Sequence, residues 1–219
     1  MHRQLAPFPA RVLEALPQTQ CTRCGYRDCA GYAQALATAE AGINQCPPGG
    51  VEGVARLAAL TGQAESPLNP AHGFEGPRSV AYIDENWCIG CTLCIKVCPT
   101  DAIVGSNKLM HTVIEAYCTG CELCLPVCPV DCILLENASG ARTGWSAWSE
   151  QQADQARQRY ALHRFRSERE AAENAMRLEQ KAREKLSDLP SHTLHTDTLV
   201  LDKKRSIIEA ALARARSKK

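Results

Sequence analysis

Two runs of four cysteines with the same spacing constrain this chain more than any other feature of its sequence. Each run reads C-x2-C-x2-C-x3-C and is followed by a proline, and the second run starts thirty residues after the first. In a reducing compartment, grouped cysteines bind metal far more often than they form disulfides. This segment is therefore predicted to fold around metal centres.

The spacing matches the ligand pattern for two [4Fe–4S] clusters in which the fourth cysteine of each run binds the other run's cluster. Gly90 and Gly120 hold the same place in the two runs and permit the tight backbone turn that a cluster requires. Two four-cysteine zinc sites are the alternative, but such sites use C-x2-C pairs separated by a longer loop. The predicted ligand sets are Cys88, Cys91, Cys94 and Cys128 for one cluster, and Cys118, Cys121, Cys124 and Cys98 for the other.

A third set of four cysteines precedes the repeat, with the spacing C-x2-C-x4-C-x16-C. Four thiolates suit either zinc or an iron–sulfur cluster, and the two clusters predicted nearby favour iron. The thirteenth cysteine, Cys132, aligns with Ala102 of the first run, so we expect it to be a small buried residue and not a ligand. The cofactor prediction is thus three [4Fe–4S] clusters, and the ligands of the first are Cys21, Cys24, Cys29 and Cys46.

The sequence divides into four regions. Only 5% of the residues are aromatic, so a single large core is not expected, and the predicted fold class is α+β. A small helical four-cysteine domain is predicted first, then a turn-rich linker, a bacterial two-cluster ferredoxin-like domain, and a charged tail with a long helix. These regions cover residues 1–62, 63–78, 79–136 and 137–219.

Local patterns place strands in the repeat and helices in the tail. We expect short strands at residues 80–83 and 133–135, and a second pair at 102–104 and 113–114. A long helix is predicted to start at Ser149, which can form a capping box with Gln152, and to end before Pro190. A second short helix is expected from Ser206 to Arg216.

Charge is distributed unevenly along the chain. Residues 1–140 carry 8 basic and 13 acidic side chains, a net charge of −5, whereas residues 141–219 carry 17 and 11, a net charge of +6. Acidic residues are interspersed in the basic tail and aromatic residues are few, which disfavours nucleic-acid binding. The tail is instead predicted to dock on a partner or on the acidic half, and its charge also suits peripheral contact with an anionic membrane.

The two cysteine patterns together, with the segments 88–94 (CIGCTLC) and 108–113 (KLMHTV), resemble the B subunit of the Rnf (also called Rsx) electron-transport complex over residues 17–136. Members of that family are iron–sulfur electron carriers in a membrane complex that links ferredoxin and NADH to ion movement. The resemblance implies a low-potential relay with ferredoxin or Rnf-like subunits as partners. Because the twenty residues before Cys21 cannot form a span, we expect a variant without the family's N-terminal transmembrane helix.

No nucleophile, acid–base pair or organic cofactor site is visible, so the chain is expected to relay electrons, and any enzyme activity would belong to a complex. Two other functions fit the sequence: a free ferredoxin-type carrier that serves a dedicated reductase, and a redox-sensing regulator whose basic tail binds nucleic acid. Residues 1–16 lack the apolar region of a signal peptide. The predicted location is the cytoplasm, including the inner face of the cell membrane.

Overall fold

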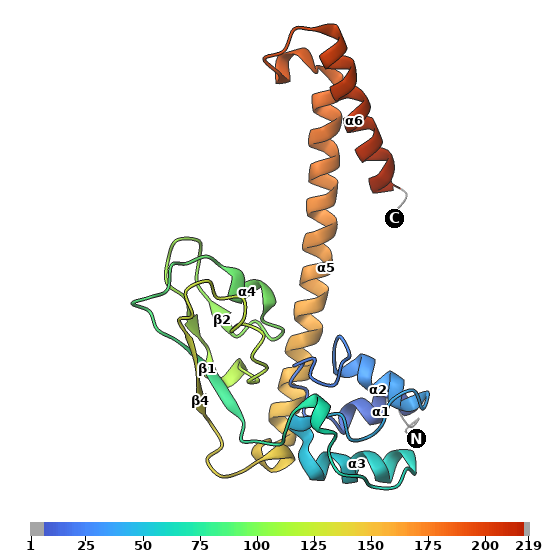
Figure 1. The fold of residues 1–219 in the computed structure, drawn as a ribbon, viewed down its shortest axis with the longest axis vertical. Helices are drawn as coiled ribbons and strands as arrows, with labels where there is room; N and C mark the ends of the chain where they lie inside the picture. Colours follow the sequence, from blue (N-terminus) through green and yellow to red (C-terminus); the bar gives the residue numbers. More distant parts are fainter. Residues whose placement is uncertain (1–6, 217–219) are drawn as a thin grey trace, which may run out of the picture. The chain divides into compact units, whose positions relative to one another are not determined.

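The structure is a computed structural model that describes residues 7–216, so the first six residues of the predicted N-terminal domain lie outside it. Helices are combined with two small sheets, which confirms the α+β class (Figure 1). The chain forms two compact units, of which the first ends at His163 and the second begins at Arg164. All the cysteines belong to the first unit.

Three helices form the N-terminal part: α1 (Phe8–Glu14), α2 (Cys29–Ala37) and α3 (Gly50–Thr61). Asp28 begins α2, because its side chain accepts a hydrogen bond from the Gly31 amide at 2.7 Å. Gly62 ends α3 in the left-handed conformation, which glycine adopts without strain. The three helices share a core of small and aliphatic side chains, centred on Val12, Tyr32, Leu36, Val54 and Leu57.

Two short antiparallel sheets frame the cysteine repeat. Strand β1 (Ser79–Ile83) pairs with β4 (Ile133–Asn137), and β2 (Ile103–Val104) pairs with β3 (Thr112–Val113). A short helix, α4 (Leu93–Val97), lies in the first cysteine run. Both predicted strand pairs are therefore confirmed, with boundaries that differ by one or two residues.

The connection between the sheets and the tail packs into the N-terminal part. Trp145 is only 3% exposed, and its indole N–H donates to the Ala15 carbonyl oxygen at 3.0 Å. The guanidinium of Arg56 lies 4.1 Å from the centre of the Trp145 ring, a cation–π contact. This tryptophan fixes the return of the chain from β4 to the helices.

Helix α5 (Glu150–Ser187) follows and is preceded by the predicted capping box. The Gln152 amide donates to the Ser149 hydroxyl at 3.1 Å, and the Ser149 amide donates to the Gln152 side chain at 2.9 Å. Its second half lies in the second unit, where i,i+4 ion pairs such as Glu179–Arg183 at 2.7 Å line the surface. Apolar side chains are exposed there as well, with Phe165 at 65% and Met176 at 56%.

The last helix, α6 (Thr198–Arg216), is longer than predicted. It begins eight residues before Ser206, because Asp197 accepts a hydrogen bond from the Leu199 amide at 2.8 Å and caps the helix. Leu199 and Ile207 remain more than half exposed. Across the part of the chain that the structure describes, no helix combines the length and the apolar character needed to cross a bilayer.

Replacing Trp145 by alanine should lower the free energy of unfolding by about 3–5 kcal/mol, because a buried indole leaves a cavity and an unpaired carbonyl. Anaerobic denaturant titration measures the change. Trp87→Ala is the matched control, since Trp87 is 68% exposed and its loss should change stability by no more than about 0.5 kcal/mol. Equal effects of the two substitutions would show that Trp145 does not anchor the connection.

Candidate iron–sulfur sites

One cavity of the ferredoxin-like segment is lined by cysteines from both runs. Its wall joins the last cysteine of the first run to the first three cysteines of the second, and apolar and polar side chains complete it. The lining cysteines are Cys98, Cys118, Cys121 and Cys124. We call it the second-run cavity. It brings together one of the two predicted sets, while ligation by that set stays a prediction.

The converse set lines another cavity, which we call the first-run cavity. It is formed by the first three cysteines of the first run, the last cysteine of the second, the non-ligand candidate Cys132, and His111. The four predicted ligands in its wall are Cys88, Cys91, Cys94 and Cys128. Each cavity therefore gathers the cysteines of one predicted set, and crossover ligation of a cluster by them stays a prediction.

The backbone repeats the same unusual conformations in the two runs. Positive φ angles recur thirty residues apart, at +66° in Gly90 and +65° in Gly120, and the same holds for Asp101 and Asp131. A Cβ on Gly120 would lie 2.2 Å from the Ser79 carbonyl oxygen, and one on Gly90 would lie 2.5 Å from a neighbouring amide nitrogen. Both glycines are therefore required by close backbone approach as well as by conformation.

Backbone amides point at equivalent sulfurs in the two cavities. The Ala81 amide donates to Cys118 Sγ at 3.3 Å, and the His111 amide, thirty residues later, donates to Cys88 Sγ at 3.4 Å. Such hydrogen bonds stabilise negative charge on sulfur and raise the reduction potential of a cluster held there. The amide contribution is therefore similar at both sites.

The side chain of His111 makes the two cavities different. It is 1% exposed, and its Nδ1 atom lies 3.3 Å from Cys94 Sγ while Nε2 lies 3.3 Å from the Ser106 carbonyl oxygen. The equivalent position beside the second-run cavity is Ala81, which has no polar side chain. The structure thus places His111 against a predicted ligand, Cys94.

Burial shifts the cysteine pKa values strongly. It raises the pKa of Cys121 and of Cys124 to about 12, with repulsion from neighbouring thiolates adding to the shift. Without a metal centre, these side chains would therefore be neutral thiols at neutral pH. Iron binds thiolates, so loading the site must release protons, as it does at other thiolate metal centres.

Cys128 and Cys132 differ although their sulfurs are only 3.6 Å apart. Burial raises the pKa of Cys132 to about 12, and its contact with Cys128 adds to the shift. Burial would also raise the pKa of Cys128, but hydrogen bonds from the backbone at Val130, Cys132 and Asp131 lower it below its usual value. Cys132 is thus suited to remain a neutral thiol beside a Cys128 thiolate.

The N-terminal cysteines gather around the start of α2. Cys29 is its first residue, and its amide donates to the Gln20 side chain at 3.0 Å. Cys24 and Cys46 pack against the core that includes Cys29. Burial raises the pKa of Cys46 far above its usual value, and repulsion from Cys21 and Cys24 raises it further. The Thr19 hydroxyl donates to Cys21 Sγ at 3.4 Å.

The N-terminal set lies against the second-run cavity. The Thr119 hydroxyl donates to the Thr19 carbonyl oxygen at 2.9 Å, and Arg23 pairs with Glu122 at 2.6 Å. Each contact joins a residue within two positions of an N-terminal cysteine to one within two positions of a second-run cysteine. Sequence reasoning missed this contact, because no local pattern links residues one hundred positions apart.

The donor chemistry of these sites fits iron–sulfur clusters. The walls of the two cavities combine thiols with apolar side chains, such as Ile103 and Leu135 in one and Ile83 and Ile133 in the other. The polar side chains in the walls are Thr100, Thr119 and Glu122 in the second-run cavity and His111 in the first-run cavity. Four of the predicted ligand cysteines line each cavity, and an all-thiolate donor set of this kind suits an iron–sulfur cluster.

Comparison with known proteins agrees with this assignment. Residues 81–135 match a family described as a 4Fe-4S dicluster domain, and residues 16–48 match one described as a putative Fe-S cluster. The chain is 61% identical over 109 residues to the B subunit of the ion-translocating oxidoreductase complex of Azoarcus sp. (strain BH72), an alignment that covers 50% of this chain and 60% of that protein. It is 60% identical over 108 residues to the protein of that name from Thiobacillus denitrificans, covering 49% and 57%.

A third relative of the same name, from Alkalilimnicola ehrlichii, is 50% identical over 111 residues, which are 50% of this chain and 59% of that protein. The chain thus spans less than two thirds of the length of these curated relatives. Over the shared half, the resemblance to the B subunit of such complexes is confirmed. Helix α5 begins beyond both matched segments.

Replacing Cys98 by serine should remove the cluster of the distant second run and spare the cluster beside it in sequence, because Cys98 lines the second-run cavity. Iron analysis and EPR spectra of the reduced protein would distinguish the two. Cys132→Ala is the control and should leave the iron content unchanged. If Cys132→Ala lost a cluster while Cys98→Ser kept all of them, the ligand assignment would be wrong.

Proposed function

We propose that this chain is the iron–sulfur electron-transfer subunit of a complex of the kind named for its relatives, and that it holds three [4Fe–4S] clusters. The observation that carries the proposal is the pair of cavities in which cysteines of both runs meet. The twelve proposed ligands are the sets Cys21, Cys24, Cys29 and Cys46; Cys88, Cys91, Cys94 and Cys128; and Cys118, Cys121, Cys124 and Cys98.

When bound, such clusters accept and release single electrons without making or breaking covalent bonds of a substrate. The residues around them set the conditions for that exchange. Apolar walls such as Ile83 and Ile103 keep water from the sulfurs, and the amides of Ala81 and His111 stabilise negative charge on them. The chain itself would relay electrons and transform no substrate.

The contacts between the sites support an order for the relay. Thr19 and Arg23 join the N-terminal set to the loop of the second run, and the crossover cysteines join the second-run cavity to the first-run cavity. The N-terminal and first-run sites would therefore form the two ends of the relay. The second-run site would lie between them.

Apolar side chains are exposed around the first-run end. Ile89 lines the cavity and is 57% exposed, so a surface group adjoins the proposed cluster directly. The neighbouring exposed residues are Trp87, Leu93, Leu109 and Met110. We propose that another electron-transfer protein, a ferredoxin or a further subunit of the complex, exchanges electrons at this end.

The predicted regions 1–62, 63–78, 79–136 and 137–219 are retained as the proposed functional division of the chain. Coupling to ion movement is proposed for the complex and not for this chain alone. The basic residues beyond position 140 would hold the tail on partner subunits or on the anionic surface of a membrane, through contacts that weaken with salt. This would place the chain at the inner face of the cell membrane.

Anaerobically prepared protein should contain about twelve iron atoms and as much acid-labile sulfide, as three cubanes require. Cys24→Ser should lower both by about a third and leave the EPR signals of the ferredoxin-like clusters in place. Stoichiometric zinc without sulfide would reject the electron-transfer function. Co-purification with other redox subunits distinguishes a member of a complex from a free carrier, which would be isolated alone.

A further inference from the structure

The first turns of α5 lie in the same compact unit as the cysteines and contact both cysteine-rich parts (Figure 1). One stripe of the helix, with Ala153 and Arg157, shares a pocket with Glu14 and Gln18 of the N-terminal part. The adjacent stripe, with Ala156 and Arg159, lines a pocket with residues 115–119 of the ferredoxin-like segment. Ala153 and Ala156 are buried, so this part of the helix is packed on both sides.

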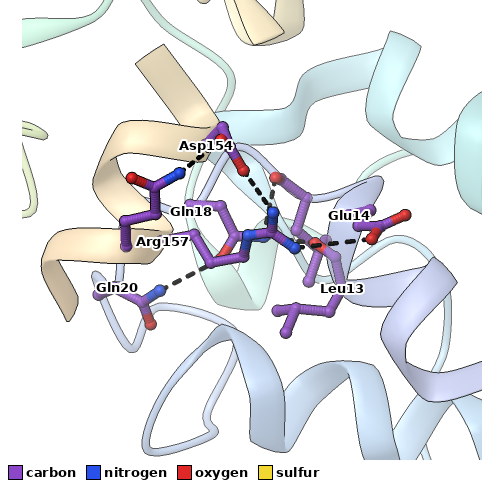
Figure 2. Close-up of polar contacts among 8 residues, drawn as sticks. Leu13, Glu14, Gln18, Gln20, Asp154 and Arg157 are labelled. Carbon is purple, nitrogen blue, oxygen red and sulfur yellow. Dashed lines mark hydrogen bonds and ion pairs between the residues drawn. The ribbon is translucent and has the colours of Figure 1, made fainter. Parts of the chain in front are cut away.

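On the N-terminal side, α5 holds the residue that begins helix α2. The Tyr160 hydroxyl donates to Asp28 Oδ2 at 2.8 Å, while Asp28 Oδ1 accepts from the Gly31 amide at 2.7 Å. Asp28 is 8% exposed and directly precedes Cys29. One turn earlier, Arg157 pairs with Glu14 at 3.6 Å and with Asp154, as Figure 2 shows. Tyr160 therefore binds the side chain of the residue that directly precedes a proposed ligand.

On the other side, α5 holds the backbone that follows Cys98. His163 Nδ1 lies 2.8 Å from Asp101 Oδ1, and their side chains are 17% and 24% exposed. Asp101 has a φ of +52°, a conformation that is strained for a residue with a side chain. The Arg159 guanidinium lies 2.9 Å from the centre of the Tyr117 ring, next to Cys118. The helix thus also contacts the region of the second-run cavity.

We infer that Tyr160 and His163 are positioning residues that hold the N-terminal cysteine set at a fixed separation from the second-run site. They lie one turn apart on one rigid helix, and each binds a carboxylate next to a proposed ligand, Asp28 beside Cys29 and Asp101 near Cys98. The inference rests on the proposed relay, since electron transfer between two sites slows steeply as their separation grows.

Two of the direct contacts between the N-terminal part and the loop of the second run, among the described residues, contribute little to holding this separation. The Arg23–Glu122 pair has side chains that are 35% and 39% exposed, and exposed ion pairs contribute little to stability. The Thr119–Thr19 hydrogen bond is a single contact to a backbone oxygen. The helix adds the contacts to Asp28 and Asp101, which are well separated in the sequence. Together with the Thr119–Thr19 hydrogen bond, these contacts restrict rotation of the N-terminal part relative to the ferredoxin-like segment.

The test uses the full chain with Tyr160→Phe and His163→Leu, singly and together, each of which removes one hydrogen bond and retains most of the packing. We expect unchanged iron content and unchanged reduction potentials. EPR spectra of the fully reduced protein report the magnetic coupling between the N-terminal cluster and its neighbour. This coupling should become weaker, or its values should spread over a wider range. Amide exchange at residues 16–48 should become about tenfold faster in the double variant, the size expected when two hydrogen bonds are lost.

Two controls make the result specific. Asp131 has nearly the same backbone conformation as Asp101, with a φ of +49°, but is exposed. Asp131→Asn should therefore leave EPR coupling and amide exchange unchanged, whereas Asp101→Asn should reproduce the effect of His163→Leu. His163→Gln, which keeps a donor, should restore part of the coupling. Unchanged coupling and exchange in the double variant would overturn the inference, and so would faster exchange spread evenly over the chain, β1 and β4 included.

Failure of the relay and failure of the positioning role give different results. Wild-type protein without iron and sulfide would reject the proposed function, yet amide exchange would still report whether Tyr160 and His163 hold the two parts together. Wild-type protein with all clusters but the same EPR coupling as the double variant would reject the positioning role alone.

Discussion

The fold of this chain depends on the burial of cysteine sulfur where other small domains bury aliphatic side chains. Two sheets of two strands each are too small to be stable alone, and the aliphatic residues between them, such as Ile83, Ile103 and Ile133, are few. Burial keeps Cys121 and Cys124 protonated far above neutral pH. A cluster held by these thiols, as we propose, would supply folding free energy that the small apolar core lacks.

The exchange of the fourth cysteine ties the two halves of the repeat together. Because Cys98 lies in the second-run cavity and Cys128 in the first-run cavity, each cavity draws cysteines from both halves, and with the proposed ligands neither half would bind its cluster without the other. The same exchange brings the two sites close, as a relay requires. Differences between them must then come from side chains, and the contact of His111 with Cys94 is the clearest one.

The matched segments end before residues that matter for the arrangement of the sites. Trp145 anchors the return of the chain, and the first turns of α5 place Tyr160 and His163 against Asp28 and Asp101. The charged helix predicted as a tail therefore has two parts. Its first part is packed against the cysteine-rich unit, and its second part belongs to another compact unit with exposed apolar and charged residues.

The sequence by itself determined the features that depend on the spacing of residues along the chain. The repeated cysteine runs predicted which cysteines line each of the two cavities, the capping box at Ser149 predicted the start of α5, and short apolar segments predicted both strand pairs. These features depend on residues within a few positions of one another or on an internal repeat, so a single sequence reveals them.

Only the tertiary structure decided which parts meet across long distances in the chain. The Thr19–Thr119 contact, the Trp145 anchor on Ala15 and the Tyr160–Asp28 bond each join residues at least one hundred positions apart. The early start of α6 also escaped prediction, because its capping residue Asp197 stands in a polar segment that resembles a linker. Such contacts arise from packing of whole elements, for which neither residue carries a local signal.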